Sequence, residues 1–220
     1  MRTIRFVVLA AAVPTLLSLA ACEDPAKDKP KATVAPASSA QADTKPASTT
    51  ATTETLDVDT TASTVGFIGS KVTGKHDGKF EKLAGKITLA DGKAEGGKIS
   101  FEVETASVKT DAGDLDKHLK NADFFDVEKF PKATFTSTEI KAGGTNGATH
   151  TITGDLDLHG VKKSITFPVT ITIAADAATG TAEFSINRKD FNITIAGKPD
   201  DLIRDDVLLK LTLKAPRKKG

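Results

Sequence analysis

Apolar residues alternate with polar ones along most of the chain from Leu56 onwards, and this period of two is the strongest constraint on the fold. Successive side chains of a β-strand point to opposite faces, so each alternating run predicts a strand with one apolar face. Turn signals such as Asp91-Gly92, Asn146-Gly147 and Thr179-Gly180 separate the runs. Long antiparallel strands of this kind in one domain predict a sandwich or a closed barrel.

One stretch breaks the alternation and predicts a short helix near residues 111–121. Leu115 and Leu119 stand four residues apart with charged residues between them, which places both on one helical face. Thr110 or Asp111 is expected to cap the start of this helix. Four large apolar residues follow it within seven positions, namely Phe124, Phe125, Val127 and Phe130. A segment this short cannot bury them alone, so we expect it to lie against one end of the sheet.

Composition excludes several classes of function. The net charge is +1 with acidic and basic residues interspersed, which gives no reason to expect a nucleic-acid partner. Cys22 is the single cysteine, so neither an intramolecular disulfide nor a cysteine metal site is expected. A membrane-spanning barrel would need girdles rich in Tyr and Trp, and the chain has neither residue.

The first 21 residues predict a signal peptide. Arg2 and Arg5 precede an apolar run that is too short, and too interrupted by Pro14, for a membrane span. The motif Leu19-Ala-Ala-Cys22 resembles a bacterial lipobox, which implies that Cys22 becomes the lipidated first residue of the mature protein. An ordinary signal peptide with an incidental cysteine is the alternative. Glu23, which follows the cysteine, favours the outer membrane.

Residues 22–55 predict a disordered linker. They are rich in Ala, Pro, Lys, Ser and Thr and contain almost no large apolar residue, so they cannot form a core. As a flexible coil this segment would span about 30 Å. We therefore expect a domain of residues 56–216 that stands clear of the membrane, followed by a basic tail at residues 217–220.

Three motifs in order resemble the YceI-like family of lipid- and polyisoprenoid-binding proteins. The first runs from His118-Leu-Lys to Asp123-Phe-Phe-Asp-Val-Glu-Lys-Phe-Pro131. The second is the stretch from Gly154 to Val169, and the third combines Ile186-Asn-Arg-Lys-Asp-Phe191 with residues 200–207. The resemblance implies an all-β fold, an extended lipocalin-like antiparallel β-barrel of about eight strands. It also implies a long isoprenoid ligand, polyprenyl or quinone-like, in the apolar lumen.

The alternation identifies candidate residues for that lumen. Inward positions on separate strands should form one tunnel, with two aromatic residues near one mouth. The candidates are Phe67, Ile99, Phe101, Phe167, Val169, Phe184 and Ile186 in the lumen, with Phe124 and Phe125 at the mouth.

No catalytic or metal-binding pattern stands out. The four histidines show no metal-ligand spacing, and we expect structural roles for them. A cluster of Asp200, Asp201, Asp205 and Asp206 near Arg204 is interpreted as an acidic turn. We therefore expect a binding protein without a cofactor and not an enzyme. A packed structural barrel, or an enzyme that uses His118, His159 or the Asp200 cluster, are the alternatives.

Overall fold

The computed structural model describes residues 24–37, 52–199 and 201–217. The one α-helix in these ranges is α1 (Gly113–Lys120), and two 3-10 turns are η1 (Thr105–Ser107) and η2 (Arg188–Phe191). The strands are β1 (Thr33–Pro36), β2 (Thr53–Asp57), β3 (Thr64–Ser70), β4 (Lys75–Phe80), β5 (Leu83–Ala90), β6 (Lys93–Glu104), β7 (Val108–Thr110), β8 (Lys132–Ala142), β9 (His150–Leu158), β10 (Val161–Ile173), β11 (Ala177–Asn187), β12 (Gly197–Lys198), β13 (Asp201–Leu202) and β14 (Asp206–Pro216).

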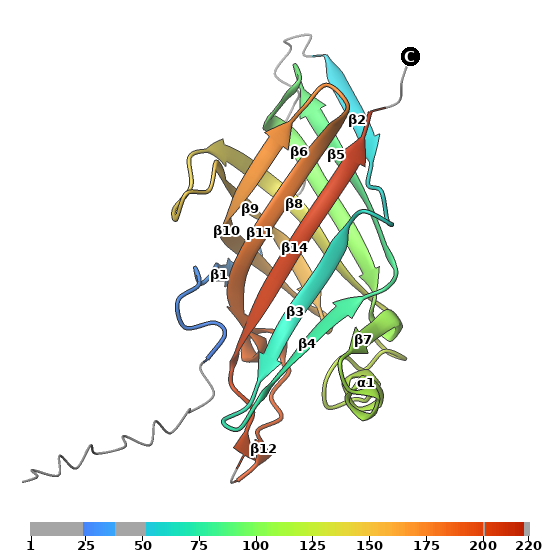
Figure 1. The fold of residues 1–220 in the computed structure, drawn as a ribbon, viewed down its shortest axis with the longest axis vertical. Helices are drawn as coiled ribbons and strands as arrows, with labels where there is room; N and C mark the ends of the chain where they lie inside the picture. The colour runs from blue at the N-terminus through green and yellow to red at the C-terminus, as the bar shows by residue number, and fades with distance from the viewer. Residues whose placement is uncertain (1–23, 38–51, 200, 218–220) are drawn as a thin grey trace, which may run out of the picture.

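Antiparallel pairing joins twelve of these strands into one curled sheet. The order along the sheet is β2-β5-β6-β8-β9-β10-β11-β14-β3-β4-β7, and β1 joins it at β10 (Figure 1). Eight of the strands have seven residues or more, and four shorter ones extend the wall. The sheet forms a half-barrel of lipocalin type, which confirms the predicted all-β antiparallel fold.

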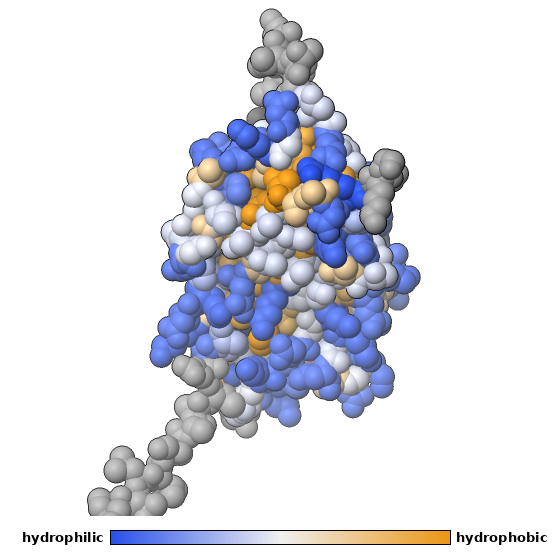
Figure 2. All heavy atoms as spheres, turned by 45° about the horizontal axis from the view of Figure 1, so that its top comes forward, coloured by the Kyte–Doolittle hydropathy of each residue, from blue (hydrophilic) through white to orange (hydrophobic). Residues whose placement is uncertain are grey.

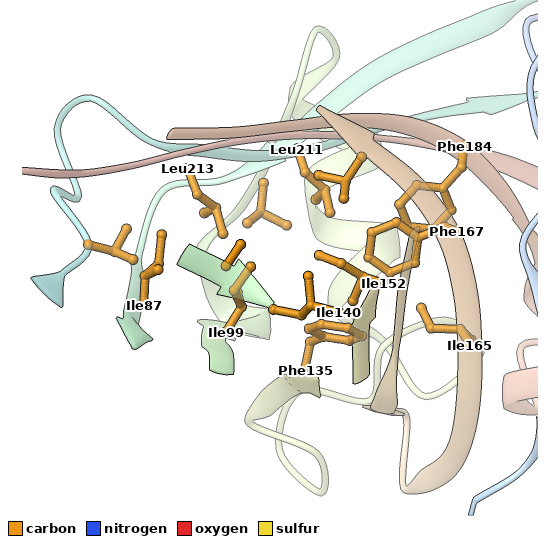
Figure 3. Close-up of a cluster of buried hydrophobic side chains, with 14 of the residues drawn as sticks. Ile87, Ile99, Phe135, Ile140, Ile152, Ile165, Phe167, Phe184, Leu211 and Leu213 are labelled. Atoms are coloured by element: carbon orange, nitrogen blue, oxygen red, sulfur yellow. The ribbon is translucent and has the colours of Figure 1, made fainter. Parts of the chain in front are cut away.

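The inner face of the curled sheet carries the core. Alternate residues on β10 and β11, such as Ile165, Phe167 and Phe184, are almost fully buried, while their neighbours face outward. Figure 3 shows side chains from several strands meeting in the interior, with Ile140 and Ile152 beside the aromatic rings. The period of two thus sorts the apolar side chains to the inside, as the sequence predicts.

The N-terminal residues 24–37 depart from the predicted disordered linker. Thr33 to Pro36 form β1, which pairs with β10 in register from Thr33↔Thr166 to Pro36↔Lys163. The small side chains of Ala26 and Ala32 are buried. The expectation of an unpacked linker is therefore wrong for residues 24–37, because strands far along the chain provide the surface that buries them. The sheet also begins before residue 56, since β2 starts at Thr53.

Helix α1 lies at the lower end of the barrel beside β7 (Figure 1). Its N-cap is Ala112, whose side chain makes no cap hydrogen bond, so the expected cap from Thr110 or Asp111 is wrong. Asp116, inside the helix, instead binds the segment before it, because its Oδ1 accepts hydrogen bonds from Thr110 N at 2.6 Å and Thr110 Oγ1 at 2.7 Å. Asp111 instead contacts His76 Nδ1 at 2.7 Å.

Some sequence predictions fall outside the described residues. These are the signal peptide, Cys22, the linker residues 38–51, Asp200 and the last three residues of the basic tail. Across the described parts of the chain, we find no helix with both the length and the apolar character that a membrane crossing requires.

Candidate ligand-binding cavity

An apolar cavity of about 170 Å³ lies inside the barrel at the end that α1 covers. Side chains from β3, β4, β6, β8, β9, β10, β11 and β14 line it, and α1 and the loop after it contribute as well. Arg188 is the one charged residue among the described residues that line the cavity. The apolar residues that line the cavity include Val65, Phe67, Phe80, Phe101, Val103, Leu119, Phe124, Phe125, Phe135, Leu156, Leu158, Ile165, Phe167, Phe184, Ile186, Leu209 and Leu211.

Three aromatic rings form the end of the cavity next to α1. Phe80 and Phe125 have ring centroids 5.5 Å apart, and Phe67 lies 5.9 Å from Phe80 and 6.3 Å from Phe125. These separations and tilted orientations are those that aromatic pairs prefer. Phe125 comes from the loop after α1, so the loop lies against the sheet at one end of the barrel, as its four large apolar residues predict.

The loop that carries Phe125 is held at both ends. At its start, Phe125 N donates a hydrogen bond to Leu119 O in α1 at 3.0 Å. At its other end, fully buried Thr105 donates from Oγ1 to Phe130 O at 2.7 Å and from its backbone N to Pro131 O at 3.0 Å. A buried hydroxyl that has found its partner is costly to break, so these bonds fix the position of Phe125.

A second set of rings crosses the middle of the barrel. Phe101, Phe135, Phe167 and Phe184 come from β6, β8, β10 and β11, and successive centroids lie 5.4, 5.6 and 4.1 Å apart. Phe167 and Phe184 stack with an angle of 12° between their planes, and Figure 3 shows them side by side. We call these four residues the aromatic layer.

The aromatic layer divides the interior into two cavities. A smaller one of about 30 Å³ lies on its other side, and Phe101, Phe135 and Phe167 line both cavities. The expected single tunnel is therefore not present, because the rings fill the middle of the lumen. Figure 2 is turned so that the upper end of the barrel in Figure 1, the end opposite α1, faces the reader. It shows hydrophobic surface in a recess at this end.

All nine predicted lumen residues lie on one or both of these cavities. Phe67, Phe124, Phe125, Phe184 and Ile186 line the larger cavity only. The smaller cavity has Ile99 and Val169 in its wall, while Phe101 and Phe167 belong to both.

Sequence reasoning missed two aromatic residues of the cavity, Phe80 and Phe135. A β-bulge between Ser137 and Glu139 shifts the register of β8, so Phe135 and Ile140 both face inward although they are five residues apart. This extra residue hides the alternation. Phe80 has Gly78 as its inward neighbour on β4, so no run of apolar residues marks that strand.

Two glycines make room for the rings. A Cβ at Gly78 would lie 2.3 Å from Phe67 Cζ, and one at Gly154 would lie 2.4 Å from Phe135 Cζ. Phe67 and Gly78 are direct partners across β3 and β4, so the ring lies over the bare backbone of its neighbour. Glycine inside a strand commonly marks such a close approach.

Arg188 has a structural role at the edge of the cavity. Its Nη1 donates to Ile193 O at 2.6 Å, its Nε to Arg204 O at 3.0 Å, and its Nη2 contacts Asp205 Oδ1 at 3.2 Å. Burial lowers the pKa of the guanidinium, and the nearby carboxylate of Asp205 opposes this shift. These bonds tie the chain after η2 to the start of β14.

The other polar candidates have structural partners as well. His159 Nδ1 lies 3.2 Å from Phe191 O, and its ring meets Phe130 edge-on with centroids 4.8 Å apart. Asp201 pairs with Lys71 and Asp206 with Lys31. Within the described ranges, no group of three or more His, Cys, Asp or Glu residues could hold a metal ion.

The curled sheet and its apolar cavity place the chain among small β-proteins of the lipocalin-like type, and comparison with known proteins narrows this class. A model of the YceI-like domain matches residues 56–215, so this chain belongs to the YceI-like family. A UPF0312 protein of Pseudomonas putida is 36% identical over 136 residues, which cover 59% of this chain and 70% of the relative. Protein YceI of Salmonella arizonae is 38% identical over 123 residues, which cover 53% and 63%.

Solved structures show the same fold. BcnA of Burkholderia cenocepacia matches with a TM-score of 0.65 and 26% identity, over 72% of this chain and 99% of that chain. A polyisoprenoid binding domain from Saccharophagus degradans, implicated in plant cell wall breakdown, matches with a TM-score of 0.59 over 74% and 98%. At 20% identity, the second comparison shows a likeness of fold alone.

Proposed function

We propose that this protein binds a long isoprenoid lipid, polyprenyl or quinone-like, with the apolar chain in the 170 Å³ cavity. The observation that carries the proposal is this cavity inside the curled sheet, with its almost wholly apolar lining. Membership of the YceI-like family supports lipid binding. A hydrocarbon gains about 0.8 kcal/mol for each CH₂ that it buries, so such a lining needs no specific polar contact.

The aromatic layer sets a length limit on the ligand. A cavity of about 150 Å³ is large enough to bind benzene, so a cavity of this size holds only one end of an isoprenoid chain. A longer chain must reach the smaller cavity beyond the layer, which requires Phe101, Phe135, Phe167 or Phe184 to turn. We therefore expect the affinity for the lipid to rise with the length of its isoprenoid chain only if the rings of this layer rotate out of the way.

We also place the protein at the cell envelope, anchored through a lipid on Cys22 in the outer membrane and facing the periplasm. The lipobox-like motif that ends at the single cysteine supports this placement, and Glu23 supports the outer membrane. Transport or storage of the lipid, or protection of the cell against stress, would then take place beside the membrane.

Substituting smaller residues in the aromatic layer tests the binding site. Phe184→Leu and Phe101→Leu keep the lining apolar and open a path between the two cavities. The Kd of a dansyl-labelled geranylgeraniol, measured by fluorescence titration of lipid-free protein, should fall about fivefold, the equivalent of about 1 kcal/mol from methylenes that become buried. Mass spectrometry of organic extracts from the purified protein identifies the natural ligand.

Phe191→Leu is the matched control. Phe191 is fully buried, as Phe184 is, yet it lines neither cavity, so this variant should lose stability similar to that lost by Phe184→Leu and keep the wild-type Kd. Absence of saturable binding by the wild-type protein at micromolar probe would refute lipid binding. A packed structural barrel would then be the better explanation.

A further inference from the structure

The wall of the barrel is interrupted between β10 and β11. These neighbours pair only from Thr170↔Thr181 to Ile173↔Ala178, which is four residue pairs. On its other side β10 pairs with β9 over nine residues, and β11 pairs with β14 over eleven. Below Thr170 the two strands separate, and we call this opening, between residues 163–169 and residues 182–187, the seam.

Residues 30–36, here the closing segment, fill the seam. Ala32 N donates to Ser185 O at 2.9 Å and Ser185 N donates to Pro30 O at 2.8 Å on the β11 side, while β1 pairs with β10 on the other. The segment runs parallel to β11 at Lys31↔Ser185 and antiparallel to β10. A strand inserted between two antiparallel neighbours must be parallel to one of them. Figure 1 shows β1 beside the lower part of β10 and β11.

The closing segment is short and has few side chains that hold it in the wall. Only two of its side chains, Ala32 and Val34, pack against the core, and both are small. Pro30 and Pro36 bracket it and have no backbone N–H to donate, which limits its ladder at both ends. The ion pair of Lys31 with Asp206, and that of Lys29 just before the segment with Glu183, are about one-third exposed or more and therefore contribute little.

The seam leads directly to the larger cavity. Ile165 and Ile186 stand on its two sides and line that cavity. On the outer surface, Pro30, Pro168 and Glu183 line a groove beside the closing segment. Leu211, on β14 opposite Ala182 of β11, lines this groove and both internal cavities.

We propose that the seam is the port through which the lipid reaches the cavity, and that the closing segment shuts it. This inference rests on the proposed lipid binding. The two ends of the barrel are less suitable, because the half-buried Phe67, Phe80 and Phe125 rings lie across the α1 end and the aromatic layer lies between the larger cavity and the opposite end. At the seam, only one short strand with small inward side chains has to leave.

The proposed anchor adds a reason for a port at this place. Asp24, the first described residue, follows Cys22 by two positions, so at most about 7 Å of chain joins them. Asp24 is itself tied to the barrel, since its Oδ2 lies 3.4 Å from Arg204 Nη1. A lipid on Cys22 would therefore hold the seam close to the bilayer, from which an isoprenoid chain could pass without crossing water.

A reversible cross-link tests the port. Ala35 and Ser164 are directly opposite each other on β1 and β10, and they alternate with Val34 and Ile165, which face inward. In the full chain with Cys22→Ser, the pair Ala35→Cys and Ser164→Cys should form a disulfide. This disulfide would lie outside the cavity and would lock the closing segment to β10. Stopped-flow fluorescence with dansyl-labelled farnesol should show uptake and release slowed by about tenfold or more, since the constrained strand can no longer leave β10. Reduction should restore both rates.

The uptake rate, the release rate and the Kd together distinguish a blocked port from a structural defect. A blocked port slows uptake and release by the same factor and leaves the Kd unchanged. The control is Thr55→Cys with Thr88→Cys, an exposed pair on β2 and β5 whose Oγ1 atoms lie 3.3 Å apart, and its disulfide should leave both rates unchanged. Unchanged rates in the oxidised seam variant, with thiol titration showing the disulfide formed, would overturn the port alone. Absence of probe binding by every variant, wild type included, would overturn the lipid function and the port together.

Discussion

Asp116 shows how one residue of α1 connects the helix to the sheet. Its side chain is 10% exposed, and Lys109 Nζ on β7 donates a hydrogen bond to Oδ2 at 2.6 Å. This bond from Lys109, followed by those from Thr110, lowers the pKa of the Asp116 carboxyl to about 2 from 3.8. Because α1 covers the end of the cavity, the charge on this residue affects how firmly that end is closed.

We expect the Asp116 carboxylate to make the free energy of unfolding depend on pH in the acidic range. Its pKa in the folded protein lies below that in the unfolded chain, so its ionised form stabilises the fold at neutral pH. That contribution is lost progressively between about pH 5 and about pH 1, as the pH falls through the folded pKa. Denaturant unfolding should show that Asp116→Asn is less stable than wild type at neutral pH, with the difference shrinking in acid.

Asp114→Asn is the control for this prediction. Asp114 lies on the same helix, but its side chain is 99% exposed, so its pair with Lys117 should contribute little. A difference between Asp116→Asn and wild type that stays constant from neutral to acidic pH would contradict the assignment.

At the scale of single elements, the N-terminal residues 24–37 behave as part of the barrel wall. They add β1 to β10, bury Ala26 and Ala32, and form ion pairs with Glu183 and Asp206. Together, the hydrogen bonds and the small buried surface should contribute about 2–4 kcal/mol.

Replacing residues 24–37 with a Gly/Ser sequence of equal length should therefore destabilise the protein. We expect the Tm in calorimetry to fall by roughly 5–10 °C, since 1 kcal/mol corresponds to about 2–4 °C for a chain of this size. The same replacement of residues 38–51, which contain no large apolar residue, serves as the control and should change the Tm little. Equal Tm values for the two variants would mean that β1 adds no stability.

Local patterns in the sequence predict most strands of this fold but not the seam. The alternation at Phe167 and Phe184 is local, so it predicts their inward orientation directly. The packing of β1 depends on β10 and Ser185, which lie far along the chain, and its own small residues are typical of a linker. Pro168 is the signal that reasoning from sequence could have used. A proline near the middle of a long strand predicts a place where one neighbour is missing.

At the scale of the whole molecule, the proposed anchor on Cys22 would determine where the barrel works. Cys22→Ser should move the protein from the membrane fraction to the soluble fraction of the envelope. The fold should remain intact, because Cys22 precedes all of the residues that form the barrel. Membrane fractionation after a salt wash, with circular dichroism of the released protein, tests both expectations. A variant that still pellets with membranes after that wash would rule out the lipid anchor.

The pairing of β1 also determines the order in which the barrel can be completed during synthesis. Residues 30–36 leave the ribosome early, yet both of their partners, on β10 and at Ser185, are made far later. Contacts between distant parts of a chain form slowly, and unpaired strand edges promote aggregation in the meantime. Of the strands that the structure describes, β1 is the first to be synthesised, so it must wait for the others and is among the last pieces of the wall to be set in place.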